Sequence, residues 1–322
     1  ASLGAGVDTT SPAEVLVAMK NGFKRDKIVY TANGMSDEDM AFVHSLRVFM
    51  NFDSLNALER YGKLVKAEHK NGDTTDISLR FDTGIIGGES SRVQTTGADS
   101  KFGIALEQAE KAKKIAAKYG LNVKMVHVHT GSAIAKGETF IESARRLFKI
   151  AEMFPELDKI DLGGGLKVSY SPKDEPIDYK WLGKEVDKLA TALNKKLGRE
   201  VTVCFEPGKY LVAESGVFLT KINEIKVKVS NTFVPETGAL KNDRKTFWLT
   251  DAGHNQCARP TNIQDKDGNP AYHHVINVSN PKGALVWVNK ITGKLCLSGD
   301  LFAVNRLMPE ASVGSVLALM NA

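Results

Sequence analysis

The chain has 322 residues, of which 42% are hydrophobic and 25% are charged, so it is long enough to bury a large core and is not disordered. The net charge of +5 comes from basic residues that are scattered along the chain, which argues against nucleic-acid binding. No apolar run reaches the ~18 residues of a membrane span, and no signal segment opens the chain, so we expect a cytoplasmic protein with no membrane contact.

The first two thirds of the chain alternate short apolar runs with longer segments of helical period, which is typical of parallel strands joined by helices. We expect strands at Gly6–Thr9, Lys27–Ala32, Val48–Asp53, Asp76–Asp82, Val123–Thr130, Lys159–Gly163 and Val201–Pro207. We expect helices at Pro12–Lys20, Asp37–Leu46, Ser54–His69, Ile104–Tyr119, Glu138–Phe154 and Tyr179–Leu197. This pattern is one strand-helix unit short of a closed (β/α)8 barrel, and we expect the missing first unit upstream of Ala1.

After Gly216 the pattern changes to alternating runs that are separated by turn residues. The expected strands are Val217–Val229, Lys245–Thr250, Val275–Val278, Ala284–Val288 and Val316–Met320. We therefore predict an α/β protein with a TIM-type barrel over residues 1–216 and a C-terminal antiparallel β domain over residues 217–322. Because the last strand stops at Ala322 without a partner, we expect that this domain also continues beyond the chain.

The three cysteines give no sign of a disulfide framework or a metal site. Cys204, Cys257 and Cys296 are an odd, widely spaced set without a CxxC or Cys/His metal spacing. A lone cysteine is usually a small buried apolar residue, and only Cys296 gains a second interpretation below.

Two strand ends carry groups that suit a phosphate. In a barrel of parallel strands the reactive groups gather at the carboxyl ends of the strands. The segment VHVHTGS places His127 and His129 on one face and follows them with Gly131 and Ser132, although two satisfied interior histidines are an equally good interpretation. Gly163–Gly165 follow the next strand, and exposed N–H groups in such a turn can bind an anion.

A third strand end, FEPGK, joins Glu206 to Gly208 and Lys209. A glutamate there is usually a salt-bridge partner, and its functional role would be to keep a heterocyclic nitrogen protonated. Three such strand ends favour a phosphate-bearing ligand at the barrel mouth. A barrel isomerase that acts on a sugar phosphate would fit equally well, and the second domain decides against it.

The ordered motifs HVHTGS, DLGGG, FEPGK, TDAGHNQCARP and KLCLSGD resemble the alanine-racemase-like, fold-type III decarboxylases. Further segments, including TGADSKFGI and YHHVINVSNPKG, resemble the diaminopimelate decarboxylase family over nearly the whole chain. The resemblance implies pyridoxal 5'-phosphate as the cofactor, with His129 stacked on its ring and Glu206 paired with its ring nitrogen. It also implies a set of residues at the cofactor phosphate: Ser132, Gly164, Gly165, Gly208 and Lys209, the last in place of an arginine found in many members.

The resemblance also implies residues that act on the substrate. Arg259 would contact a substrate carboxylate, and Cys296 would enter from the partner subunit of a homodimer and help to return a proton to the product. The family's diaminopimelate enzymes carry a glutamate after this cysteine, where this chain has Leu297, and Asp300 could compensate for that change. The expected activity is decarboxylation of meso-diaminopimelate to L-lysine in lysine biosynthesis.

Three alternatives remain open. A carboxylated polyamine could be the substrate, because Leu297 departs from the diaminopimelate pattern. The scaffold could be a non-catalytic relative, and a racemase is a weaker choice because racemases lack a partner like Glu206. The lysine that the family joins to its cofactor is expected upstream of Ala1, so the chain as written is expected to be inactive.

Overall fold

The computed structural model describes residues 2–68, 74–88, 93–234, 236, 239–265 and 267–322. It divides into two compact units. The first contains most of the chain up to Gly208, and the second contains residues 168–176 and Lys209–Ala322. The segment Val168–Pro176 therefore packs with the second unit although it lies between two strands of the first. Among the described residues no helix is both long and apolar enough to cross a membrane.

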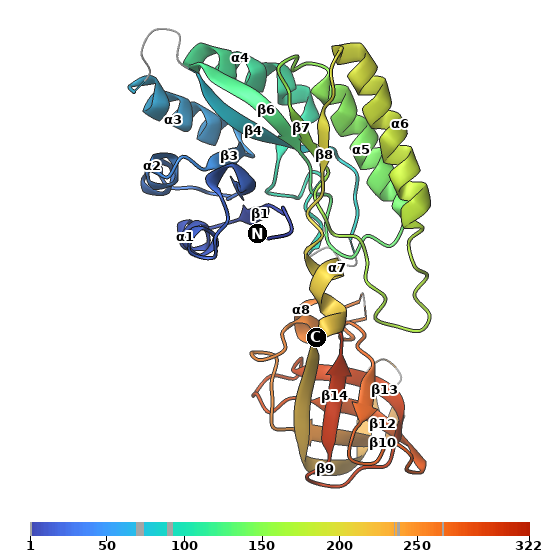
Figure 1. Cartoon of the computed structure of the whole chain (residues 1–322). Helices are drawn as coiled ribbons and strands as arrows, with labels where there is room; N and C mark the ends of the chain where they lie inside the picture. Colours follow the sequence, from blue (N-terminus) through green and yellow to red (C-terminus); the bar gives the residue numbers. More distant parts are fainter. Residues whose placement is uncertain (1, 69–73, 89–92, 235, 237–238, 266) are drawn as a thin grey trace. The chain divides into compact units, whose positions relative to one another are not determined.

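The first unit is built on a parallel sheet whose strand order follows the chain (Figure 1). Its strands are β1 (Val7–Thr9), β2 (Ile28–Tyr30), β3 (Phe49–Phe52), β4 (Thr75–Asp82), β6 (Leu121–His127), β7 (Lys159–Asp161) and β8 (Thr202–Cys204). The short strand β5 (Ile104–Ala105) pairs with the end of β4. Among the described strands, β1 and β8 lie at the two edges of the sheet. The predicted TIM-like α/β architecture is confirmed as a parallel half-barrel.

Six helices cover the outside of this sheet, as Figure 1 shows. They are α1 (Pro12–Lys20), α2 (Asp37–Ser45), α3 (Leu55–Lys66), α4 (Ala109–Tyr119), α5 (Gly137–Ala151) and α6 (Tyr179–Leu197). Local chemistry fixes many of their ends. The side chains of Ser11, Ser36, Ser54 and Asp178 accept hydrogen bonds from backbone N–H groups in the first turns of α1, α2, α3 and α6. Gly120 and Gly198 end α4 and α6 in the left-handed conformation that glycine adopts without strain.

One predicted helix begins later than expected. Residues 104–108, the start of the predicted helix Ile104–Tyr119, form β5 and a 3-10 turn (Leu106–Gln108), and α4 begins only at Ala109. Gly103, with φ +85°, turns the chain so that Ile104 pairs with Phe81 at the end of β4. Tertiary pairing therefore overrides the helical pattern at this point.

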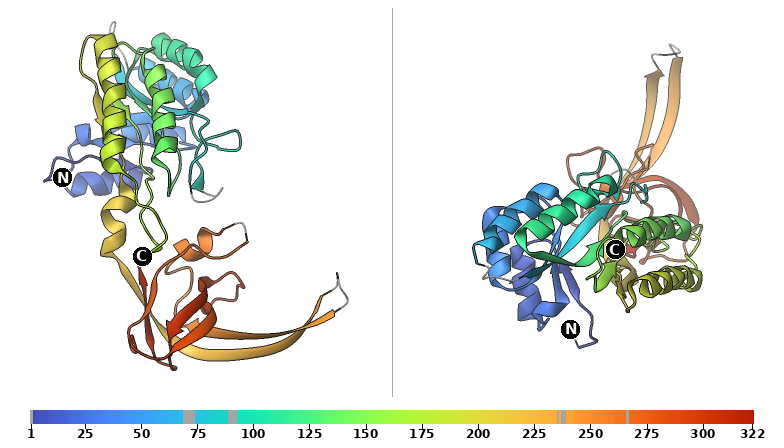
Figure 2. Two further views of the ribbon diagram at one scale, coloured as in Figure 1. Left: turned by 90° about the vertical axis from the view of Figure 1, so that its right-hand side faces the viewer. Right: turned by 90° about the horizontal axis from the view of Figure 1, so that it is seen from above.

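The second unit is a six-stranded sheet in the order β11-β14-β9-β10-β12-β13. Its strands are β9 (Val217–Val234), β10 (Ala239–Thr250), β11 (Val275–Asn277), β12 (Leu285–Thr292), β13 (Leu301–Pro309) and β14 (Val316–Met320). It also contains the short helices α7 (Gly208–Val212) and α8 (Arg259–Asn262). Figure 2 shows β9 and β10 as a long two-stranded ribbon.

Two details of this domain differ from the prediction. The pairing of β10 with β12 is parallel, so the sheet is antiparallel except at this pair. Strand β13, which pairs with β12, was not predicted, because its apolar residues do not alternate regularly with polar ones.

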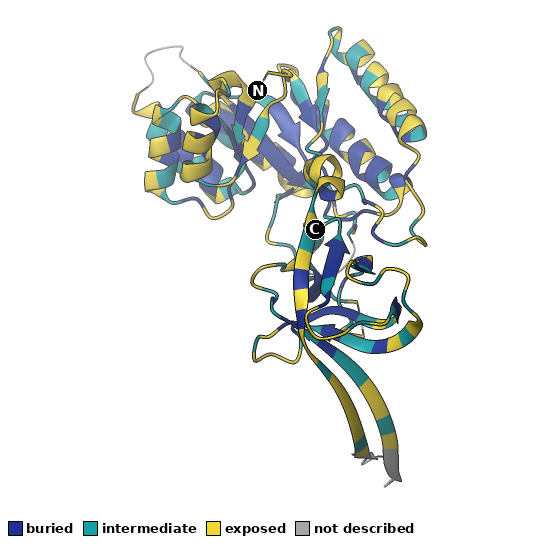
Figure 3. Cartoon of the chain, turned by 60° about the horizontal axis from the view of Figure 1, so that its bottom comes forward, coloured by how far each residue is buried: buried dark blue, intermediate teal, exposed yellow. Residues whose placement is uncertain are grey.

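Each unit has its own apolar core. Figure 3 shows the strands of the parallel sheet largely buried and the outer faces of the helices exposed. The largest fully buried side chains of the first unit include Tyr30, Phe52, Tyr61, Phe81 and Phe140, and those of the second include Trp248 and Phe302. The first core holds the carboxyl ends of the parallel strands in fixed positions, which is what a site built on several strands requires.

Candidate active site

Three strand ends of the parallel sheet meet through their backbones. A Cβ atom on Gly164 would lie 2.0 Å from the carbonyl oxygen of Glu206, and one on Gly165 would lie 1.7 Å from that of Gly131. Gly163 and Gly165 have φ values of +68° and +83°, which side chains rarely tolerate. The triglycine turn after β7 thus packs directly on the turns after β6 and β8. We call these three turns, Gly131–Ser132, Gly163–Gly165 and Glu206–Gly208, the glycine cradle.

Hydrogen bonds hold the glycine cradle together. The N–H of Glu206 donates to the carbonyl of Gly163 at 2.8 Å, and the N–H of Ile134 donates to the carbonyl of Gly165 at 2.7 Å. The N–H of Gly208 donates to the carbonyl of Glu206 at 2.9 Å, so a bound phosphate would have to take over this donor. Sequence reasoning grouped these turns as neighbours, and the structure brings them into contact.

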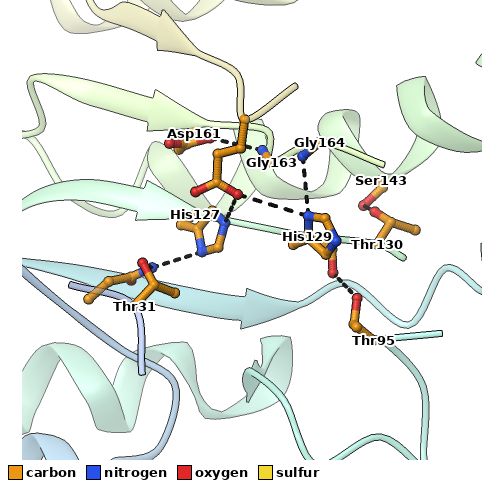
Figure 4. A network of polar contacts seen from close by, with 11 residues as sticks. Thr31, Thr95, His127, His129, Thr130, Ser143, Asp161, Gly163 and Gly164 are labelled. Carbon is orange, nitrogen blue, oxygen red and sulfur yellow. Dashed lines mark hydrogen bonds and ion pairs between the residues drawn. The ribbon is translucent and has the colours of Figure 1, made fainter. Parts of the chain in front are cut away.

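The two histidines of HVHTGS have different environments (Figure 4). His127, at the end of β6, is 1% exposed, and its Nε2 lies 3.4 Å from Oε2 of Glu206. His129 is partly exposed, and its Nδ1 accepts a hydrogen bond from the N–H of Gly164 at 3.2 Å. The Nδ1 of His129 also lies 3.9 Å from the Glu206 carboxylate. His129 can therefore face a ligand, whereas His127 belongs to the interior.

Buried charges surround Glu206. Burial raises the pKa of Glu206, and the Arg80 guanidinium opposes that rise. Burial and the Glu206 charge raise the pKa of Asp161 to about 7, and an oxygen of Asp161 accepts a hydrogen bond from the N–H of Gly163 at 2.9 Å. Burial lowers the pKa of His127 to about 4, so this imidazole is neutral at pH 7. The centre of the site can therefore exchange protons near neutral pH.

Two interior polar residues of this centre were missed by sequence reasoning. Asn51 lies in β3 and is 1% exposed, and its Nδ2 lies 2.8 Å from Nδ1 of His127. Arg80 lies in β4 and is 8% exposed, with its guanidinium 4.6 Å from the centre of the Phe102 ring. Both stand among buried residues of their strands, and a polar residue next to apolar ones in a strand is the signal that could have identified them.

Three ligand-type side chains approach one another closely at the same place. Donor atoms of His127, Asp161 and Glu206 lie within 4.8 Å of one another, the one such group among the described residues. Glu206 also lies 3.9 Å from Nδ1 of His129, so this group of side chains adjoins the glycine cradle.

The predicted substrate residue Arg259 lies in the second unit, at the start of α8. Its guanidinium lies 3.6 Å from the centre of the Tyr170 ring, and its Nη1 lies 3.1 Å from Nε2 of His273. The Nδ1 of His273 lies 2.9 Å from the carbonyl oxygen of Met320, so this ring can donate there and accept from Arg259. A cavity of about 480 Å³ brings Arg259 and Lys209 together within this unit. This cavity offers two cations to an anionic group.

The loop that carries Cys296 is fixed by Asp300. Cys296 and Leu297 are exposed, while Asp300 is 1% exposed. One oxygen of Asp300 accepts from the N–H of His254 at 2.7 Å, and the other accepts from the N–H of Leu295 at 2.9 Å. Because both oxygens are engaged by backbone groups, Asp300 is better suited to holding this loop than to receiving a substrate ammonium.

Fold and site together define a barrel enzyme that binds a phosphate-bearing aromatic cofactor at the carboxyl ends of its strands. The triglycine turn Gly163–Gly165 leaves no room for Cβ atoms, and His129 and the Glu206 carboxylate lie next to it, so the residues present fit pyridoxal phosphate. The family described as "Pyridoxal-dependent decarboxylase, pyridoxal binding domain" matches residues 1–213. The chain belongs to this family and, within it, to the diaminopimelate decarboxylases.

Individual relatives agree with this assignment. The diaminopimelate decarboxylase of Methanothermobacter thermautotrophicus is 31% identical over 99% of this chain and 70% of its own length. That of Pseudomonas fluorescens is 31% identical over 100% of this chain and 71% of its own length. The solved structure of Helicobacter pylori diaminopimelate decarboxylase complexed with L-lysine has a TM-score of 0.82 at 26% identity, covering 99% of this chain and 74% of that chain.

Proposed function

We propose that the protein is a pyridoxal-phosphate-dependent carboxy-lyase that converts meso-diaminopimelate to L-lysine. The observation that carries this proposal is the glycine cradle with Glu206 beside it, in a chain whose relatives are diaminopimelate decarboxylases. The Helicobacter pylori relative that was solved with L-lysine supports the choice of product.

The cofactor contacts follow the strand ends of the first unit. Ser132, Gly164, Gly165 and the backbone at Gly208 bind its phosphate, and Lys209 adds a positive charge. His129 packs against the ring, because its Nδ1 is fixed by the N–H of Gly164. Bound pyridoxal phosphate supplies an electron-withdrawing ring that stabilises the carbanion left when CO2 departs.

Glu206 controls one proton of this reaction. Its carboxylate is partly buried and lies near two imidazoles. As an anion it accepts a hydrogen bond from a protonated ring nitrogen, which keeps the ring electron-poor. We therefore expect the rate of decarboxylation to depend more strongly on Glu206 than on any other described side chain of the first unit.

Three residues from the C-terminal part of the sequence are proposed to act on the substrate. Arg259 binds a substrate carboxylate with its forked guanidinium. Cys296 returns a proton to the product, and Asp300 holds the Cys296 loop in shape. We further propose that the protein is a cytoplasmic homodimer in which Cys296 acts at the partner's cofactor.

The exposed Leu297 favours a second candidate substrate. A leucine cannot accept a hydrogen bond from an ammonium group. A substrate that buried its ammonium there would lose about 1 to 3 kcal/mol of binding free energy. A carboxylated polyamine, with its charges spaced differently, is the substrate class that this observation favours.

Release of CO2 by the protein tests the proposal. We expect CO2 from meso-diaminopimelate, and a loss of about hundredfold or more in Glu206→Ala. Glu156→Gln changes an exposed carboxylate and serves as the control. Release from a carboxylated polyamine alone would select the second candidate, and no release from either would indicate a non-catalytic relative.

A further inference from the structure

A line of polar contacts crosses the interior of the first unit and ends at Glu206. The Nδ2 of Asn51 lies 3.3 Å from Oγ1 of Thr31 and 2.8 Å from Nδ1 of His127. On the other side of the ring, Nε2 of His127 lies 3.4 Å from Oε2 of Glu206. Figure 4 shows His127 in the middle of this network, with Thr31 on one side. Two strands, β3 and β6, and the residues that follow two others, β2 and β8, contribute to this line.

The orientation of the Asn51 amide determines which nitrogen of His127 carries the proton. The amide nitrogen has two hydrogens, and its two neighbours at hydrogen-bond distance are Thr31 Oγ1 and His127 Nδ1. His127 Nδ1 must then accept, so the single proton of a neutral imidazole lies on Nε2. In the orientation shown, the amide oxygen of Asn51 has no hydrogen-bond partner. Reversing the amide would instead leave both N–H donors of its nitrogen without an acceptor, which costs more free energy.

The Nε2–H of His127 then lies 3.4 Å from Oε2 of Glu206, outside hydrogen-bond geometry, and it has no other acceptor among the described residues. His127 stays neutral because burial lowers its pKa to about 4. The titratable and charged groups that act on Glu206 and His127 are His129, Arg80, Asp8, Asp53 and Asp161. The carboxylates among them favour a protonated Glu206, while Arg80 and the N–H of His127 favour the anion.

We propose that Asn51 and His127 are positioning residues: Asn51 fixes a neutral imidazole with its proton on Nε2, so that this N–H dipole lies 3.4 Å from Glu206 and favours its carboxylate over its acid form. Neither residue touches the substrate. The consequence for the cofactor ring nitrogen rests on the proposed function, whereas the proton position on His127 is a property of the chain alone.

Nitrogen NMR of the chain with 15N-labelled histidine, without added cofactor, tests this directly. His127 is identified by the loss of its signals in His127→Gln. We expect an unprotonated Nδ1 and a protonated Nε2, unchanged between pH 8 and pH 5, because the ring remains neutral over that range. A proton on Nδ1, or a doubly protonated ring, would overturn the proposal.

A second measurement uses Asn51→Asp, which replaces the amide donor at this position by a carboxylate that accepts. Its carboxylate accepts from Nδ1, so the His127 proton pattern should reverse and pyridoxal phosphate should bind about tenfold more weakly. The matched control is Asn122→Asp, an exposed substitution in β6 beside Asp76. It should alter neither quantity. An unchanged proton pattern in folded Asn51→Asp would also overturn the proposal. A normal pattern without CO2 release in the decarboxylase assay would count against the proposed function alone.

Discussion

Replacing Gly165 by alanine should break the glycine cradle. The new Cβ would lie 1.7 Å from the carbonyl oxygen of Gly131 and 3.4 Å from Cα of Ser132. The residue would also have to keep a φ of +83°, which costs about 1 to 2 kcal/mol for a side chain with a Cβ. Forcing an atom into packed backbone adds about 1 to 3 kcal/mol. We expect Gly165→Ala to lower the free energy of unfolding by about 2 to 5 kcal/mol.

The same substitution should weaken cofactor binding, because the turn with Gly131 and Ser132 must move away from the triglycine turn. Urea unfolding measures the first effect, and titration with pyridoxal phosphate measures the second. Gly183→Ala in α6 is the matched control, since a Cβ there meets no atom within 4 Å. It should stabilise the protein by up to about 1 kcal/mol, because alanine favours a helix interior. If Gly165→Ala unfolds like this control and binds pyridoxal phosphate with unchanged affinity, the close backbone packing is not what forms the site.

Three further predictions concern single side chains. The pKa of Asp161 is raised from 3.8 to about 7, so its contribution to stability is full below pH 4 and is lost as the pH rises through 7. Asp161→Asn keeps an acceptor for the Gly163 N–H but cannot ionise, so up to about 4 kcal/mol of the pH-dependent loss should be absent. The free energy of unfolding in urea should therefore change less with pH than in the unmodified protein. Asp300→Ala should cost about 2 to 3 kcal/mol and speed amide hydrogen exchange in the Cys296 loop, and unchanged exchange would contradict its role. Ser54→Ala removes the N-cap of α3 and should cost about 1 kcal/mol in thermal unfolding, and no loss would mean that water replaces the cap.

The sequence by itself determined the order and most ends of the elements in the first unit. The helices Pro12–Lys20 and Tyr179–Leu197 agree with the prediction to the residue. This accuracy has a local cause, because a helix cap and the 3.6-residue spacing of apolar side chains both depend on residues close together in the sequence. The motifs around His129, the triglycine turn and Glu206 were also visible in the sequence, because each directly follows a strand.

The tertiary structure alone decided how the interior of the site is connected. The contact of Asn51 with His127 joins residues 76 positions apart, so a polar residue in a buried strand could mark Asn51 as unusual but no local pattern identifies its partner. The parallel pairing of β10 with β12 depends equally on long-range contacts. The two backbone donors on Asp300 come from residues 46 and 5 positions away, and they indicate that it holds a loop. The spacing of apolar residues predicts which side of a helix or strand is buried. Which residues it contacts on that side depends on tertiary packing.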